Sequence, residues 1–212
     1  MDLLFNLSQQ LVLVKDLRGI LDFDEVDKKM NGLVYKDNTE NKISLEMHLL
    51  DDPVFADAKR TIVTECEQFL VHAVGLQGFF TNLVMTSSWA NITEPNHSHH
   101  EHMHPFSVCS GTIFLDDNPS NLNLNIEAHL PQVPYFIPKN KSYASLHNLL
   151  LDQKLDLANI EHLKHHMVVF LSNFHHFVSK NENAPTRRSI AFNTFWDGVT
   201  GVAGENLGSH KF

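Results

Sequence analysis

The chain has 212 residues, of which 42% are hydrophobic and 19% are charged, and its formal net charge is -9 with neutral histidines. This length is typical of one domain with a sizeable core, and the composition is that of an ordinary globular protein. No apolar run approaches the ~20 residues of a membrane span, and the N-terminus lacks the basic region and cleavage site of a signal peptide. The sequence therefore predicts a single cytoplasmic domain over residues 1–212, with no membrane segment.

The charged residues and cysteines exclude two further classes of protein. Apart from Arg187 and Arg188 the basic residues are scattered, whereas a surface that follows nucleic-acid phosphates normally carries clustered Lys and Arg. Cys66 and Cys109 are too few for a disulfide framework, so we expect reduced thiols. The sequence gives nucleic-acid binding little support and favours a small-molecule or peptidyl substrate, and a homodimer is compatible with these features.

The first third of the chain predicts short strands followed by helices. Residues 1–50 alternate apolar runs with polar turns, which indicates strands and one short helix around residues 21–30. Over residues 52–75, apolar positions recur at three- and four-residue steps, the spacing of an amphipathic helix. Pro53 near its start and Gly75 near its end match the positional preferences of these residues. We expect this helix to support a sheet.

Residues 79–197 carry the main predicted sheet structure. Short apolar runs bounded by Pro, Asn, Asp or Gly predict strands over residues 79–89, 108–115, 122–126, 167–171 and 189–196. Many short strands without long helices between them favour an antiparallel sandwich or jelly roll. Segment 142–163 could form a short helix or cover the sandwich, and residues 198–212 are expected to be a loose tail. Trp89 and Trp196 are expected in the core.

A histidine-rich segment between two of these strands indicates a metal site. Residues 97–104 contain five histidines and one glutamate, which are good ligands for a borderline divalent ion. Because alternate residues of a strand face the same side, His102 and His104 can point together, and so can His99 and Glu101. A third ligand usually comes from a distant segment, and His176 in an apolar, strand-like context is the candidate.

A second constellation lies about one strand further along the chain. In an extended strand Arg187, Ser189 and Asn193 share one face, and Arg188 faces the other side. An arginine beside a serine offers a fork of N–H donors and a hydroxyl, which suits the binding of a carboxylate in a pocket.

Three blocks together, residues 88–91, 102–111 and 170–193, resemble the 2-oxoglutarate/Fe(II) oxygenases of the type common in phage and marine bacterial genomes, within the prolyl-hydroxylase-like superfamily. The resemblance spans residues 45–197. It implies a mainly β, double-stranded β-helix of cupin-like type with a supporting N-terminal helix, and Fe(II) at one mouth. It also implies that 2-oxoglutarate is bound through its distal carboxylate by Arg187 and Ser189, with Asn91 and Asn193 in the same site. The implied reaction uses O2, hydroxylates an unidentified substrate and releases succinate and CO2.

The metal ligands depart from the wider superfamily, which uses His-x-Asp or His-x-Glu plus a distal His. We favour His102, His104 and His176, because Pro105 and Ser107 fit the family register only in that way. The alternatives are a triad of His99, Glu101 and His176, or two histidines and water. Other functions also stay open: a cupin-type metal enzyme that does not use 2-oxoglutarate, a non-catalytic metal- or ligand-binding barrel, or a surface loop that collects metal ions.

Overall fold

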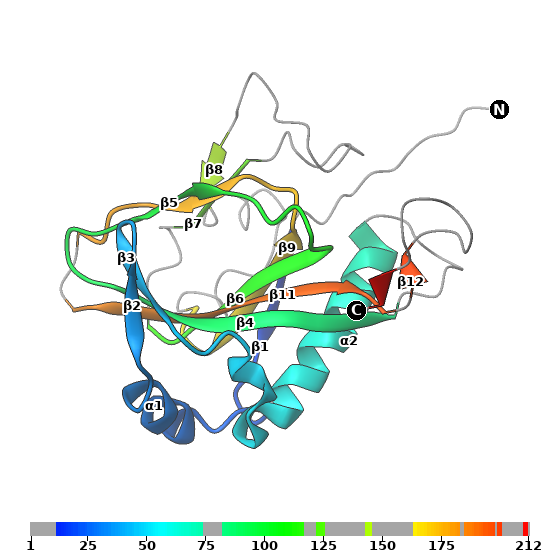
Figure 1. The fold of residues 1–212 in the computed structure, drawn as a ribbon, viewed down its shortest axis with the longest axis horizontal. Coiled ribbons are helices and arrows are strands. Elements are labelled where there is room, and N and C mark those ends of the chain that lie inside the picture. Colours follow the sequence, from blue (N-terminus) through cyan, green and yellow to red (C-terminus); the bar gives the residue numbers. More distant parts are fainter. Residues whose placement is uncertain are drawn as a thin grey trace.

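The computed structural model describes residues 12–73, 82–116, 122–125, 143–145, 163–182, 185–197, 199–200 and 210–211, and strands dominate these ranges (Figure 1). The strands form two main sheets that face each other. The larger sheet has the order β1 (Leu13–Asp16), β9 (His166–Leu171), β6 (Cys109–Phe114), β11 (Arg187–Trp196), β4 (Leu83–Thr93), β3 (Asn41–Ser44) and β2 (Tyr35–Asn38). The smaller sheet has the order β5 (His99–His102), β10 (His176–Val178), β7 (Leu122–Asn125) and β8 (Tyr143–Ser145).

The path of the chain between the sheets identifies the fold. From β4 to β11 the chain passes repeatedly from one sheet to the other, and every pairing within the two sheets is antiparallel. Two facing antiparallel sheets built by such alternation form a jelly roll, the arrangement also known as a double-stranded β-helix. The predicted fold class is confirmed.

Helices cover the outer face of the larger sheet (Figure 1). They are α1 (Phe23–Asn31), α2 (Ala56–Ala73) and two 3-10 turns, η1 (Leu49–Asp51) and η2 (Pro53–Phe55). The Asp22 side chain caps α1 by accepting hydrogen bonds from the backbone N–H groups of its first turn, and Asp52 accepts one from Val54 at the start of η2. The helix predicted over residues 52–75 is thus η2 followed by α2, and the predicted end at Gly75 lies outside the described residues.

The main core lies between α2 and the larger sheet. Ile62, Cys66 and Phe69 of α2 are fully or almost fully buried in one cluster with Ile190 and Phe192 of β11. Burying a large apolar side chain contributes roughly 1.5–3 kcal/mol, so this interface holds the helix on the sheet. One face of the larger sheet is used in this way, and the opposite face is left for the space between the two sheets.

Gly111 allows its neighbours on β11 and β9 to pack closely against β6. A Cβ atom at this position would lie 2.3 Å from the Phe192 ring and 2.4 Å from the backbone oxygen of Val168. Both distances are far below van der Waals contact, so the packing requires a residue without a side chain.

Three segments differ from the predictions. Strand β4 continues to Thr93, four residues beyond the predicted end, and this extension carries Asn91 into the sheet. In the tail that was expected to be loose, β12 (Val199–Thr200) pairs with β13 (His210–Lys211). Strands of two residues are too short to show alternation in the sequence. In segment 142–163, which was expected to form a short helix or to cover the sandwich, residues 143–145 form β8, and most of the rest lies outside the described residues.

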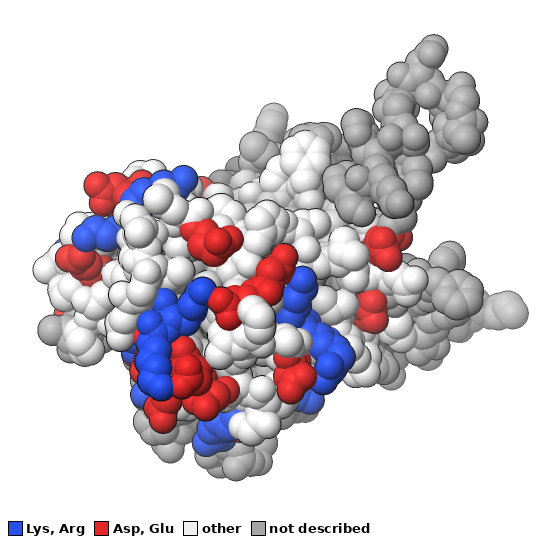
Figure 2. All heavy atoms as spheres, turned by 60° about the horizontal axis from the view of Figure 1, so that its bottom comes forward, with Lys and Arg blue, Asp and Glu red and all other residues white. Residues whose placement is uncertain are grey.

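Basic and acidic side chains are mixed on the surface, as the face seen in Figure 2 shows. The ion pairs of the described residues include Lys29–Asp52 and Arg188–Asp27. Among the described residues, no helix combines the length and the apolar character needed to cross a membrane.

Candidate functional site

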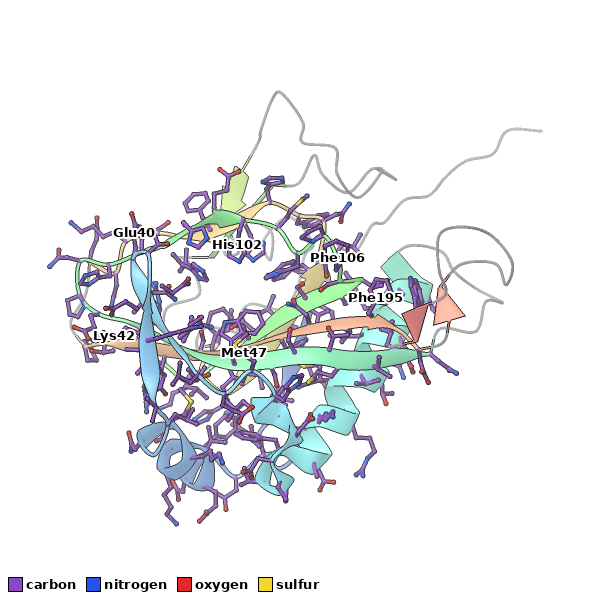
Figure 3. All side chains as sticks on the ribbon, in the orientation of Figure 1. Glu40, Lys42, Met47, His102, Phe106 and Phe195 are labelled. Carbon is purple, nitrogen blue, oxygen red and sulfur yellow. The ribbon has the colours of Figure 1, made fainter. Side chains whose placement is uncertain are left out.

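Strand pairing in the smaller sheet brings distant histidines together. His102 of β5 lies directly opposite His176 of β10, with ring centroids 4.3 Å apart. His104 follows the end of β5, and its backbone N–H donates to the carbonyl of Ser172 at 3.0 Å. Its ring lies 4.9 Å from that of His102 and 5.2 Å from that of His176. Each of the three rings offers one nitrogen, and these nitrogens lie within 4.8 Å of one another. In Figure 3 His102 points from β5 towards the larger sheet.

Hydrogen bonds to backbone carbonyls orient two of these rings. Nδ1 of His102 lies 2.9 Å from the carbonyl oxygen of His100, and Nδ1 of His176 lies 3.0 Å from that of Phe174. A carbonyl can only accept, so Nδ1 carries the proton of each neutral ring and the lone pair on Nε2 is free. Such outer hydrogen bonds are typical of histidines that bind metals.

Burial keeps the three imidazoles neutral. It lowers the pKa of His102, lowers that of His104 to about 3, and lowers that of His176 well below its usual value. The neighbouring imidazoles act in the same direction, because two adjacent rings cannot both be charged without repulsion. At neutral pH the site therefore presents three lone pairs, which is the state that binds a metal.

A polar chain from the larger sheet reaches His104. Nδ2 of Asn193 lies 3.4 Å from Nδ1 of His104, and Oδ1 of Asn193 accepts a hydrogen bond from Ser110 at 2.7 Å. The Ser110 hydroxyl lies 2.7 Å from that of Ser172. Asn193 was expected to contact the cosubstrate. The structure places it beside His104 instead, and among the described residues it does not line the pocket that contains the other candidates.

That pocket lies between the two sheets, and it contains both predicted constellations. The polar residues that line it are Asn91, Thr93, His99, His102, His104, Ser110, Thr112, His176, Arg187 and Ser189. Aromatic walls are supplied by Trp89, Phe114, Phe170 and Phe192. The predicted ligands and the predicted carboxylate-binding pair thus face one space, although they come from opposite sheets.

Arg187 is the most unusual group in the pocket. Arg187 is 7% exposed, and both of its terminal nitrogens are buried without a hydrogen-bond partner among the described residues. Burial lowers its pKa to about 10, so it still carries its charge at neutral pH. A buried charge without a partner is costly, and a carboxylate bound in the pocket would supply the missing acceptors. Ser189 lies two residues along the same strand and lines the same pocket.

Arg188 shows that the neighbouring position has a different role. It pairs with Asp116 at 3.0 Å and with Asp27 at 2.9 Å. Strand alternation turns this side chain away from the pocket, as the sequence predicted.

Glu101 points away from the metal-binding candidates. Its Oε1 atom lies 3.0 Å from Nδ1 of His175, and within the described residues Glu101 does not line the pocket. Two groups of described side chains have ligand atoms close enough to share an ion: His102, His104 and His176, and separately His99, His100 and His102. Neither group contains Glu101, so the geometry supports the all-histidine set over the alternative with a carboxylate.

His99 enters the pocket because of a β-bulge. Between β5 and β10, His102 pairs with His176 and His99 pairs with Val178, so three steps on β5 match two on β10. The extra residue shifts the alternation, and the ring of His99 stacks on that of His102 at 4.6 Å. Burial lowers the pKa of His99 to about 3. Strict alternation would have placed these two rings on opposite faces.

Trp89 is a pocket residue that sequence analysis assigned to the core. It is only 8% exposed, yet it lines the pocket, and its Nε1–H donates to Oδ1 of Asn91 at 3.2 Å. Asn91 also accepts from Nδ2 of Asn41 at 3.3 Å. The signal that could have revealed Trp89 is its spacing of two from Asn91 in a strand.

Comparisons with known proteins bear on the family and the fold of the chain. A family model described as "Putative 2OG-Fe(II) oxygenase" matches residues 87–193. No curated protein matches the chain. Among solved structures, the fold is similar to that of an oxidoreductase of the 2OG-Fe(II) oxygenase family from Burkholderia pseudomallei, with 10% identity and a TM-score of 0.55 over 89% of this chain and 85% of that chain.

Two further structures show the same similarity. HygX from Streptomyces hygroscopicus, solved with nickel and 2-oxoglutarate bound, has 10% identity and a TM-score of 0.52 over 90% of this chain and 85% of that chain. The non-heme alpha ketoglutarate dependent epimerase SnoN from nogalamycin biosynthesis has 11% identity and a TM-score of 0.52 over 96% and 92%. At such low identity these structures establish the fold of the chain.

Proposed function

Since the chain belongs to the 2OG-Fe(II) oxygenase family, we propose that it is a dioxygenase that uses Fe(II), 2-oxoglutarate and O2 to hydroxylate a small-molecule or peptidyl substrate, with release of succinate and CO2. One observation carries the proposal. The guanidinium of Arg187, whose terminal nitrogens have no hydrogen-bond partner in the part of the chain that the structure describes, lines the same pocket as three convergent, neutral histidines. A pocket that contains both a cation in need of hydrogen-bond acceptors and three nitrogen ligands suits a carboxylate compound that also binds a metal.

The residues present fit the iron. His102, His104 and His176 would hold it, and three protein ligands leave coordination positions open for other molecules. The bonds from Nδ1 to backbone carbonyls fix the rings of His102 and His176 before any ion binds. Imidazole is a ligand suited to iron and to its neighbours in the transition series. When bound, iron and 2-oxoglutarate together supply the oxidative chemistry, in which decarboxylation of the cosubstrate drives oxygen transfer.

The residues present also fit 2-oxoglutarate. Arg187 binds the distal carboxylate, and Ser189 adds a hydroxyl donor beside it. The other end of the diacid then faces the histidines that line the same pocket. Trp89, Phe170 and Phe192 give the pocket apolar walls, which exclude water and strengthen the charge pairing. The contribution of the protein is to orient the bound molecules and to keep the reacting site dry.

The test is an anaerobic titration of 2-oxoglutarate into Fe(II)-loaded protein, monitored by the weak visible charge-transfer band of a chelated complex. We expect the band in the parent protein. Replacing Arg187 with Met should spare iron binding but cost ~2–5 kcal/mol of cosubstrate affinity, about thirtyfold to several thousandfold. Ser189→Ala removes one neutral donor and should cost about 0.5–1.5 kcal/mol.

Arg188→Met is the matched control, because this arginine faces away from the pocket and pairs with Asp116. It should leave the affinity unchanged. Equal affinity in Arg187→Met and the parent would remove the cosubstrate site and favour a metal enzyme without 2-oxoglutarate. If Arg187→Met instead loses affinity as expected, a screen of candidate substrates for coupled succinate release identifies the molecule that is hydroxylated.

A further inference from the structure

We propose that His99, His100 and His102 form a second site, at the edge of the pocket, for a borderline divalent ion such as Zn2+. Their ligand atoms lie within 4.8 Å of one another. The ring centroids are 5.0 Å apart for His99 and His100, 4.6 Å for His99 and His102, and 5.1 Å for His100 and His102. We name this group the outer histidine site and the group His102, His104 and His176 the inner histidine site.

The backbone of β5 explains why three near-consecutive histidines converge. In a regular strand, neighbours such as His99 and His100 point to opposite faces and cannot share an ion. The register shift opposite His176 and Val178 breaks that alternation within β5. The bulge therefore brings the exposed His100 ring to the partly buried rings of His99 and His102. Bulges of this kind are typical of places where a strand redirects side chains for a function.

The distances suit a tetrahedral ion. With Zn–N bonds of about 2.0–2.1 Å, ligand nitrogens in a tetrahedron lie roughly 3.4 Å apart, so small ring rotations from the present positions close the site. Glu101, the one carboxylate inside β5, is directed to His175 and does not contribute. An all-imidazole set selects Zn2+, Ni2+ or Cu2+ over Mg2+ and Ca2+, which prefer oxygen ligands.

Sharing His102 couples the two sites. Nδ1 of His102 is engaged with the carbonyl of His100, which leaves one ring nitrogen for an ion. An ion in the outer histidine site therefore takes His102 away from the inner one. Binding of Zn2+ there would leave the inner histidine site with His104 and His176 alone. The outer site itself needs no oxygenase activity, and only this inhibitory consequence rests on the proposed function.

The experiment is a Zn2+ titration of the full chain against a chromophoric chelator, using variants that break one site at a time. His104→Ala disables the inner site and should still bind one equivalent of Zn2+, and His176→Ala provides the same test through another residue. In the double variant His100→Ala/His104→Ala, the remaining Zn2+ affinity should fall by more than about 10- to 100-fold. That range is typical when a residue that only hydrogen-bonds to a metal ligand is lost, and His100 is proposed to be a ligand itself. Adding His97→Ala instead is the matched control, because His97 lies on the same segment but in neither group.

The outcomes separate this proposal from the proposed function. If His104→Ala and His176→Ala both fail to bind Zn2+ while remaining folded by circular dichroism, the outer histidine site does not exist. The same conclusion follows if His100→Ala adds nothing to the loss. In the single variant His100→Ala, the charge-transfer band of Fe(II) and 2-oxoglutarate reports on the inner histidine site alone. Absence of this band would count against the oxygenase proposal and not against the outer histidine site.

Discussion

At the scale of single residues, His175 and His176 are neighbours in sequence with different surroundings. His176 faces the pocket and the rings of His102 and His104, whereas His175 pairs with Glu101 at 3.0 Å. We predict that His176→Ala abolishes Fe(II) binding at the inner histidine site, because a site with two ligands from one segment loses its third anchor. His175→Ala should retain binding there with a much smaller loss. Anaerobic titration with Fe(II) in the presence of 2-oxoglutarate, followed by the charge-transfer band of the inner histidine site, measures both.

The same titration distinguishes the two ligand sets. With an all-histidine site, His104→Ala loses the charge-transfer band and Glu101→Gln keeps it, since Glu101 lies outside the pocket. The reverse result, with loss of the band in Glu101→Gln and retention in His104→Ala, would establish the triad that contains a carboxylate. A larger loss in His175→Ala than in His176→Ala would mean that the strand is in a different register.

At the scale of elements, β6 depends on the absence of a side chain at Gly111. We predict that Gly111→Ala destabilises the fold, because its Cβ would overlap the Val168 carbonyl and the Phe192 ring. Overpacking of this kind typically costs about 1–3 kcal/mol, and a backbone atom cannot move aside as a side chain can. Urea unfolding followed by circular dichroism would measure the change.

Gly32, at the end of α1, is the matched control for this substitution. A Cβ atom there would meet the carbonyls of Lys29 and Lys28 at 3.5 and 3.7 Å, which are ordinary contacts. Gly32→Ala should therefore leave the free energy of unfolding nearly unchanged. Similar losses in the two variants would contradict the proposed role of close packing at Gly111.

The elements also show which parts of the site were predictable from the sequence. His102, His176, Arg187 and Ser189 could be placed because they obey strand alternation and lie beside apolar runs. His99 could not be placed, because its orientation depends on a bulge whose position is set by pairing with β10. Asn193 has the predicted face, but its neighbour is decided by the path of the chain after β5, which brings His104 to it.

The fold itself was predictable for a related reason. Apolar runs separated by turn residues indicate strands, and helical spacing indicates α2, so the layers follow from local patterns. The order of strands in the two sheets depends on long-range pairing and was not predicted; the resemblance to a family implied only the double-stranded β-helix. Strands too short to alternate, such as β12 and β13, leave no pattern in the sequence.

At the scale of the whole molecule, the larger sheet divides its two faces between stability and binding. One face packs on α2 and is apolar, and the other carries polar groups whose partners are not all within the protein. Arg187 is the extreme case, since the described residues offer its buried terminal nitrogens no acceptor. The fold must therefore tolerate a destabilising group in order to present it to a ligand, a compromise that is common at functional sites.

This compromise predicts opposite effects of one substitution on stability with and without ligand. In metal-free protein without 2-oxoglutarate, Arg187→Met should raise the free energy of unfolding by about 1–3 kcal/mol. The substitution replaces an unsatisfied buried charge with an apolar side chain of similar length. Arg188→Met should lower it or leave it unchanged, since Arg188 has Asp116 and Asp27 as partners. With 2-oxoglutarate at a thousand times its dissociation constant from the Fe(II)-loaded parent, the parent should gain about 4.1 kcal/mol. This gain exceeds the advantage of Arg187→Met, which binds the cosubstrate poorly, so the parent becomes the more stable protein. Urea unfolding under both conditions measures the crossover; a metal-free Arg187→Met less stable than the parent would mean that the guanidinium already has a stabilising partner within the fold.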